Sequence, residues 1–178
     1  MIDAQLDEGL LKALRPYQIE ALSMIRQYIS SDSMKQALVK MPMGTGKSTV
    51  IAVTGSELTP NQSVIVVTAT KAVRDQIVKD ISNEVWVKMG LSFRLTKTIH
   101  MIIPSKLTSV PDSPTIFICT IQSLLTLKEN HNELYRGLKN KVDLVLFDEG
   151  HKEPANTWQS VIRSFEKKYY FIYCNAGS

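Results

Sequence analysis

Residues 41–49 contain the residue types that bind phosphate groups. Glycines let backbone N–H groups turn toward an anion, and the positive end of a following helix strengthens that attraction. Lys47 is long enough to reach the β- and γ-phosphates of a nucleoside triphosphate, and the Ser48 hydroxyl can be a ligand of Mg²⁺. The usual phosphate-loop pattern begins with glycine, whereas this chain has Met41 there. The residues expected to surround the phosphates are Gly44, Thr45, Gly46, Lys47, Ser48 and Thr49.

Two adjacent carboxylates, Asp148 and Glu149, follow the apolar run 142–147. Because ligands of parallel α/β sheets bind beyond the carboxyl ends of the strands, Asp148 is expected beside the phosphate loop. There it could hold Mg²⁺ through a water together with Ser48, while Glu149 orients the attacking water. A solvated acidic strand end would also explain the pair, but its combination with a phosphate loop favours nucleotide hydrolysis. The expected catalytic residues are Lys47, Asp148 and Glu149.

Short apolar runs rich in β-branched residues alternate with longer amphipathic stretches. Continuous apolar runs are typical of strands covered on both faces, and the alternation predicts βαβ units. We therefore expect an α/β fold, a three-layer α/β/α sandwich with a parallel central sheet. Residues 96–114 are expected to be mostly loop, with a strand at 93–98 as the alternative. The predicted strands are 37–41, 64–68, 115–120, 143–147 and 169–174, and the predicted helices are 16–30, 47–58, 71–87 and 156–167.

The 178 residues suffice for one domain, here residues 1–178, and argue against two. Apolar residues make up 44% and charged residues 21%, which excludes a mainly disordered chain. The net charge of +4 permits a nucleic-acid partner without demonstrating one. No apolar run approaches the ~18 residues of a membrane-spanning helix and the acidic start is unlike a signal peptide, so we expect no membrane partner and a cytoplasmic location. Cys119 and Cys174 lie in apolar segments and are expected to be buried free thiols.

Together these segments resemble the first motor domain of the superfamily 2 helicases and translocases, the DEAD/DEAH-box-like proteins. The resemblance covers residues 14–176 and is greatest for the restriction-type and bacterial defence-type members. Residues 41–48 are similar to motif I, in which another residue commonly replaces the first glycine. Residues 148–151, Asp-Glu-Gly-His, are similar to motif II. The resemblance implies a RecA-like P-loop NTPase domain with ATP and Mg²⁺ as cofactors.

Three other segments resemble motifs that contact ligands in this family. Residues 14–18 are similar to the motif ahead of the phosphate loop, which implies that Gln18, with Arg15, holds adenine. Residues 67–71 are similar to motif Ia and residues 118–124 to motif Ib, which contact the sugar–phosphate backbone of one nucleic-acid strand. Taken alone, Thr and Gln after a strand are more often helix caps. The implied nucleic-acid contacts are Thr70, Lys71, Thr120 and Gln122, with His151 as a link from the catalytic site.

The resemblance also implies that a second RecA-like domain completes the motor by supplying arginines to the γ-phosphate. No such domain fits in this length, so we expect a fragment of a longer protein that binds ATP·Mg²⁺ weakly and hydrolyses it slowly at most. Residues 175–178 match motif III poorly, because the motif is either divergent or cut. DNA is the expected substrate and RNA the alternative.

Two other functional classes compete with a motor. One is a nucleotide-binding regulatory module without turnover, against which the intact Glu149 argues. The other is a small-molecule kinase, which would need an arginine-rich lid that the sequence lacks.

Overall fold

The structure is a computed structural model. It describes residues 6–32, 37–42, 44–92, 95, 97–148, 160–161 and 163–175. For residue 42 and residues 168–175 only the backbone is described.

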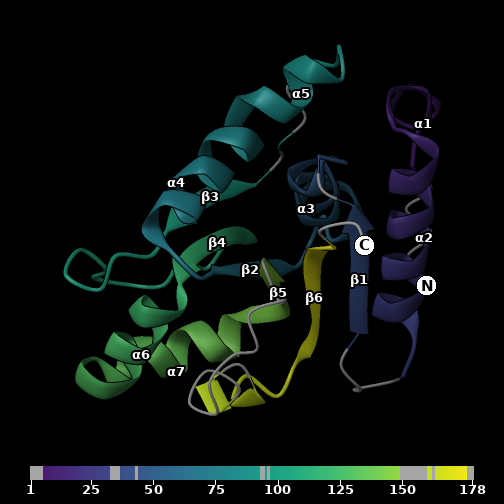
Figure 1. Cartoon of the computed structure of the whole chain (residues 1–178). Helices are drawn as coiled ribbons and strands as arrows, with labels where there is room; N and C mark the ends of the chain where they lie inside the picture. Colours follow the sequence, from purple (N-terminus) through teal and green to yellow (C-terminus); the bar gives the residue numbers. More distant parts are fainter. Residues whose placement is uncertain are drawn as a thin grey trace.

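The centre of the molecule is a six-stranded sheet in the order β1-β6-β5-β2-β4-β3, with every neighbouring pair parallel. This confirms the predicted α/β fold with a parallel sheet (Figure 1). One strand lies in the segment expected to be mostly loop: residues 98–101 pair with the start of β4. The strands are β1 Ala37–Pro42, β2 Ser63–Thr68, β3 Thr98–Met101, β4 Thr115–Thr120, β5 Val142–Asp148 and β6 Lys168–Asn175.

Helices connect the strands, as the alternating pattern predicted, but their bounds differ from the prediction. The predicted helices 47–58 and 71–87 each change from α to π geometry part of the way along. Three helices were not predicted: α1, α6 and α7. Of the predicted helix 156–167, residues 156–159 and 162 lie outside the described residues, while Ser160, Val161 and Arg163 are helical and a turn follows them. The helices are α1 Glu8–Ala13, α2 Pro16–Ser30, α3 Lys47–Val53, η1 Thr54–Leu58, α4 Lys71–Lys79, η2 Asp80–Glu84, α5 Val85–Lys88, α6 Ile121–Asn130 and α7 Asn132–Lys141.

Local capping explains where two of the unpredicted helices, α1 and α6, begin. Asp7 accepts a hydrogen bond from the Leu10 backbone N–H (2.9 Å) at the start of α1. Thr120 accepts one from Ser123 N–H (3.1 Å) at the start of α6. Such caps satisfy backbone donors that the first turn of a helix leaves without partners.

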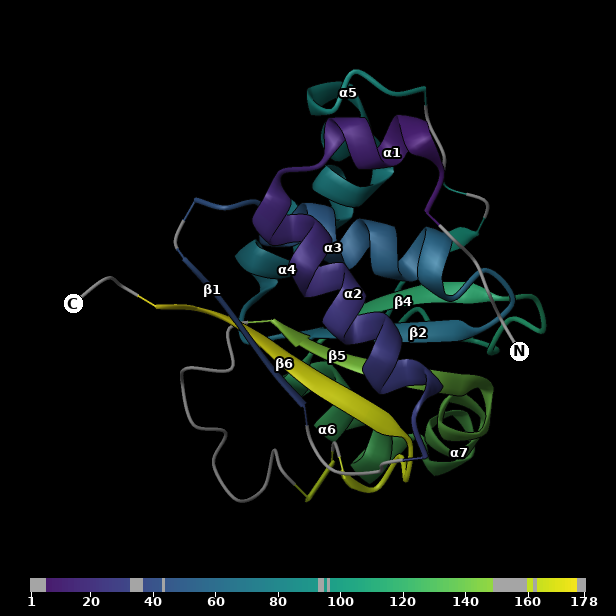
Figure 2. The same ribbon diagram turned by 90° about the vertical axis from the view of Figure 1, so that its right-hand side faces the viewer.

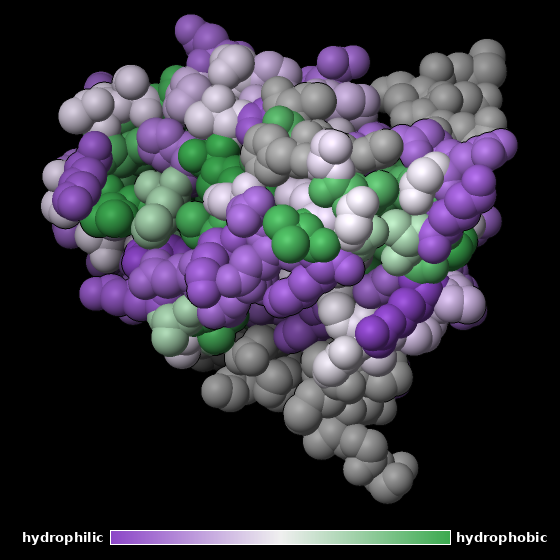
Figure 3. Space-filling view, turned by 90° about the horizontal axis from the view of Figure 1, so that it is seen from above, coloured by the Kyte–Doolittle hydropathy of each residue, from purple (hydrophilic) through white to green (hydrophobic). Residues whose placement is uncertain are grey.

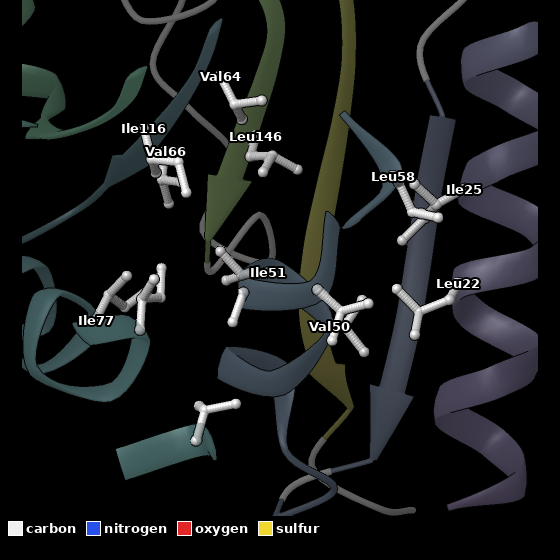
Figure 4. Close-up of a cluster of buried hydrophobic side chains, with 14 of the residues drawn as sticks. Leu22, Ile25, Val50, Ile51, Leu58, Val64, Val66, Ile77, Ile116 and Leu146 are labelled. Atoms are coloured by element: carbon white, nitrogen blue, oxygen red, sulfur yellow. The ribbon is translucent and has the colours of Figure 1, made fainter. Parts of the chain in front are cut away.

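Two hydrophobic clusters hold the layers together, one on each face of the sheet. Helices α1 to α5 cover one face and α6 and α7 cover the other (Figure 2). Side chains of successive strand residues alternate between the clusters: Val64 and Val66 pack on the first, Ile65 and Val67 on the second. The first cluster joins residues of α2, α3 and α4 to the sheet (Figure 4). Both faces of β2 are therefore buried, which is why it reads as a continuous apolar run.

Cys119 is a free, fully buried cysteine, as predicted. Its burial raises the pKa of the thiol well above the ordinary value. The thiol is thus protonated and has the character of a small apolar side chain. The side chain of Cys174 lies outside the described residues.

Hydrophilic side chains predominate on the surface that is uppermost in Figure 1, with hydrophobic ones in small patches between them (Figure 3). Among the described residues, the large hydrophobic side chains that stand exposed are Leu11, Met24, Leu38 and Val87. Within the part of the chain that the structure describes, no helix has the length and apolar character needed to cross a membrane.

Lys97 is a buried cation that makes stability depend on pH. Its ammonium donates hydrogen bonds to the carbonyls of Thr59 and Gln62, and only 7% of the residue is exposed. Burial lowers the pKa of the amine from 10.5 to about 8, although the carboxylate of Asp143 opposes this shift. Between pH 8 and 10.5 the unfolded chain binds more protons than the folded one, so this group's contribution to the free energy of unfolding rises with pH there.

Urea unfolding at pH 7.5 and 9.5, on the parent and on Lys97→Met, measures this contribution. The parent is expected to gain about 1 kcal/mol relative to the variant, less than the full shift because the amine keeps some contact with solvent. Opposing effects from Cys119 are common to both proteins and cancel. A gain that is equal in the two proteins would contradict the assignment.

Candidate nucleotide site and nucleic-acid groove

The phosphate loop lies between the end of β1 and the start of α3. Gly44 and Gly46 have φ of 77° and 81°, in the left-handed region that favours glycine. Gly46 is the residue that precedes α3, so the first turn of α3 presents its backbone N–H groups toward the loop. The Gln18 Nε2 of α2 donates a hydrogen bond to the Thr45 carbonyl (2.9 Å), which fixes the loop from the side.

Lys47 and Asp148 meet at this loop, although 100 residues separate them in the sequence. The Lys47 Nζ lies 2.9 Å from Asp148 Oδ1, with side-chain exposures of 20% and 5%. Their strands are not neighbours, since β6 lies between β1 and β5. The parallel sheet brings the ends of all three strands to one edge, as predicted for ligand-binding residues. The roles assigned to these residues stay predictions.

The Ser48 hydroxyl, in the first turn of α3, bonds to a residue that the sequence analysis missed. Ser48 Oγ donates to Asp80 Oδ2 (2.5 Å), and Gln76 Nε2 donates to Asp80 Oδ1 (2.8 Å). A signal was present in the sequence: Asp80 stands between Ile77 and Ile81 on the face of the helix that meets the core. A carboxylate on a buried face is uncommon unless another group pairs with it, so Asp80 could have been singled out as a candidate.

The chemistry of the donor set fits Mg²⁺ in the predicted position. Mg²⁺ binds oxygen ligands and usually combines one or two protein carboxylates with substrate phosphates and waters. Ser48 would supply a hydroxyl oxygen and Asp148 a carboxylate. Bound there, Mg²⁺ would neutralise charge on the phosphates during transfer.

The two residues expected to hold adenine, Gln18 and Arg15, differ in burial and in their hydrogen-bond partners. Gln18 is 6% exposed, and both ends of its amide are bonded, Oε1 to the Arg15 backbone N–H (3.0 Å) and Nε2 to the phosphate loop. Arg15 is exposed, and its guanidinium donates to the Tyr17 hydroxyl (2.7 Å). In this geometry Gln18 positions the loop. Because an amide has two N–H donors and two acceptor lone pairs, these two bonds do not by themselves exclude a contact with adenine.

A groove of about 400 Å³ lies between the starts of α4 and α6. Lys71, Thr120 and Gln122 line it, so the structure brings these three residues together, and their contact with nucleic acid stays a prediction. Thr120 is buried and bonded to Ser123, and Thr70 accepts from Val73 N–H (3.3 Å), so both hydroxyls act as helix caps. The other residues of the groove are Arg74, Ile103, Pro104, Ser105, Ser123, Thr126 and His131.

Within the groove, Arg74 bonds to Asp75 through two nitrogens, at 2.8 and 2.7 Å. The exposed cation of its lining is Lys71. Among the lining residues that the structure describes, the groove therefore offers one exposed ammonium beside amide and hydroxyl groups, a composition suited to phosphate and sugar rather than to base edges.

Gly46→Ala should reduce nucleotide affinity at least about tenfold, because two effects coincide at this position. A Cβ would lie 2.6 Å from Gln18 Nε2, and the residue holds a left-handed φ. The matched control is Gly90→Ala, which has φ of +66° but no atom within 4 Å of the new Cβ. It should cost about 1–2 kcal/mol of stability and leave affinity unchanged. Titration of ATP·Mg²⁺ against both variants measures the difference, and equal affinities would contradict this account of the loop.

Three predicted positions lie outside the described residues: Glu149, His151 and most of the motif III segment 175–178.

Comparisons with known proteins show the family of the chain and solved structures with a similar fold. The family model for "Type III restriction enzyme, res subunit" matches residues 11–173. No curated protein matched the chain. Among solved structures, the UvsW helicase from bacteriophage T4 superposes with a TM-score of 0.60 at 16% identity, over 91% of this chain and 52% of its own.

Two further solved structures, each a complex with DNA or a DNA mimic, have similar TM-scores. The DUF1998 helicase MrfA, bound to DNA and AMPPNP, gives a TM-score of 0.63 at 14% identity, over 98% of this chain and 27% of its own. The Type ISP restriction-modification enzyme LlaGI, in complex with a DNA substrate mimic, gives 0.61 at 15% identity, over 92% and 17%. The chain thus spans about half or less of the length of these proteins. It belongs to the family of the res subunit of type III restriction enzymes, and the resemblance to superfamily 2 helicases is confirmed.

Proposed function

We propose that this chain is the ATP-binding and hydrolysing domain of a helicase or translocase that acts on DNA. The observation that carries the proposal is the 2.9 Å contact between Lys47 and Asp148 at the phosphate loop. It supports a site in which a cation for phosphate and a carboxylate for Mg²⁺ are within reach of one triphosphate. In the proposed reaction Glu149 would activate a water that attacks the γ-phosphate, the bond between the γ-phosphorus and the β–γ bridging oxygen would break, and ADP and inorganic phosphate would leave.

DNA is the preferred substrate because two similar structures, MrfA and LlaGI, are complexes with DNA or its mimic. RNA is the alternative, since a similar structure is described as a hypothetical RNA helicase from Sulfolobus tokodaii. Competition between labelled single-stranded DNA and RNA of the same sequence decides between them. Tighter binding of RNA would overturn the assignment to DNA.

A phosphate-release assay with and without DNA tests whether ATP is turned over. For this chain alone we expect ATP binding with slow release, because arginines from a second domain supply roughly 10³–10⁵ in rate at related sites. A longer protein that contains both domains, assayed in place of this chain, should show phosphate release that DNA stimulates. Binding without any release in that longer protein would favour the regulatory module instead.

Lys71 and Gln122 are proposed to hold the sugar–phosphate backbone of one strand across the groove. Lys71→Ala should weaken binding of single-stranded DNA several-fold. It should also reduce the slope of log affinity against log salt concentration by about one, the change expected when one phosphate contact is lost. Gln122→Ala should weaken binding without changing the salt dependence, because it removes no charge. The control is Lys12→Ala, an exposed lysine of α1 that pairs with Glu8. Equal losses in the Lys71 and Lys12 variants would contradict the placement of DNA in this groove.

A further inference from the structure

Asp80 is a buried carboxylate bonded directly to the phosphate-loop helix. It is 8% exposed, and its neighbours Ile77 and Ile81 belong to the hydrophobic core. Burial of a charge without partners is costly, so a buried carboxylate is retained only where donors face it. Both oxygens of Asp80 have such donors, Gln76 on its own helix and Ser48 on α3.

The bond from Ser48 determines what the hydroxyl can do next. A serine hydroxyl has one hydrogen to donate and two lone pairs to offer. At 2.5 Å, the contact with Asp80 is in the range of a charge-assisted O–H···O⁻ bond, in which the hydroxyl donates its hydrogen. The hydroxyl hydrogen is then held toward Asp80, and the lone pairs face away from it. A hydroxyl that binds a cation must do so through a lone pair.

The backbone changes at the same residue. The helix has α geometry over Lys71–Lys79 and π geometry over Asp80–Glu84, before α geometry resumes at Val85. Single π turns inside α-helices are frequent at functional sites. Gln76, one turn earlier, bonds the second oxygen of Asp80 and so fixes the orientation of the carboxylate.

We propose that Asp80 is a positioning residue for the magnesium–nucleotide site, which orients the Ser48 hydroxyl so that a lone pair is available to Mg²⁺. The inference rests on the proposed function, because it requires Ser48 to be a magnesium ligand. Asp80 itself touches neither the metal nor the phosphates in this arrangement. Its effect is transmitted through one hydrogen bond, which makes it separable from a purely structural role.

The test compares binding of a fluorescent ATP analogue with Mg²⁺ and with EDTA. Asp80→Ala should lower affinity about tenfold in Mg²⁺ and leave affinity in EDTA unchanged, because only the metal-dependent part uses the oriented hydroxyl. Asp80→Asn keeps an oxygen acceptor for Ser48 and should lose only about threefold. Glu84→Gln is the control: it removes a carboxylate of the same π turn that faces Lys79 and Lys88, and both affinities should stay unchanged. Circular dichroism verifies that each variant is folded. If Asp80→Ala does not fold, Asp80→Asn serves as the test.

A double-mutant cycle with Ser48→Ala separates positioning from simple charge. In the Ser48→Ala background, Asp80→Ala should cause no further loss of Mg²⁺-dependent affinity. A full tenfold loss in that background would mean that the Asp80 charge acts on the metal directly, and would overturn the inference. So would equal losses in Mg²⁺ and EDTA. If the parent binds no ATP·Mg²⁺, the proposed function fails and the inference with it, whereas a parent that binds and an Asp80→Ala variant that binds equally well overturn the inference alone.

Discussion

Lys47→Ala is expected to lower the affinity for ATP·Mg²⁺ about 100-fold or more, which for a weakly binding domain means no measurable binding. The lysine would bond to phosphate oxygens of both the β- and γ-groups. Each hydrogen bond to a charged group contributes about 1.5–3 kcal/mol, so the loss of two corresponds to roughly this factor. Isothermal titration or fluorescence titration of the parent and the variant measures it.

Two companion variants make this result interpretable. Lys47→Ala also removes the partner of the buried Asp148, so Lys47→Gln, which can still donate a hydrogen bond to that carboxylate, is measured beside it. Both should lose nucleotide, and at least the Gln variant should unfold near the parent's temperature. Lys40→Ala removes an equal charge from an exposed position of β1 and should bind normally. Retention of parental affinity in both Lys47 variants would disprove the nucleotide site.

Trp86→Ala should have the largest effect on stability, about 3–5 kcal/mol. Trp86 is fully buried in α5, and its indole Nε1–H donates to the Ile81 carbonyl (2.9 Å). Truncation leaves a cavity in the first hydrophobic cluster and a carbonyl without its donor. For a domain of this size the loss lowers the melting temperature by roughly 6–20 °C. Thermal and urea unfolding followed by circular dichroism measure it without relying on tryptophan fluorescence.

The adjacent residue provides the control for that experiment. Val87 is 64% exposed, so Val87→Ala should change the free energy of unfolding by no more than about 0.5 kcal/mol. Trp86→Phe keeps most of the apolar volume and should fall between the two. If Trp86→Ala and Val87→Ala were equally stable, the packing of α5 described here would be wrong.

The core strands could be predicted from sequence because burial on both faces leaves an unmistakable pattern. Val64 to Val67 form an apolar run whose side chains alternate between the two clusters, and every one of them is buried. Helix α6 was harder to predict, since its polar and apolar residues follow a strand without Gly or Pro to separate them. Strand β3 is also short and only partly buried, so it lacks the apolar run that marks the others.

The sequence by itself determined the chemistry offered by this protein: a phosphate loop with Lys47, a carboxylate at the end of an apolar strand, and the order of motifs typical of superfamily 2. These follow from residue types and local spacing. Only the tertiary structure decided which distant groups meet. Lys47 reaches Asp148 because parallel strands end at one edge of the sheet, and Ser48 reaches Asp80 because two helices pack on the same face. Contacts of that kind depend on the packing of whole elements, which no local pattern encodes.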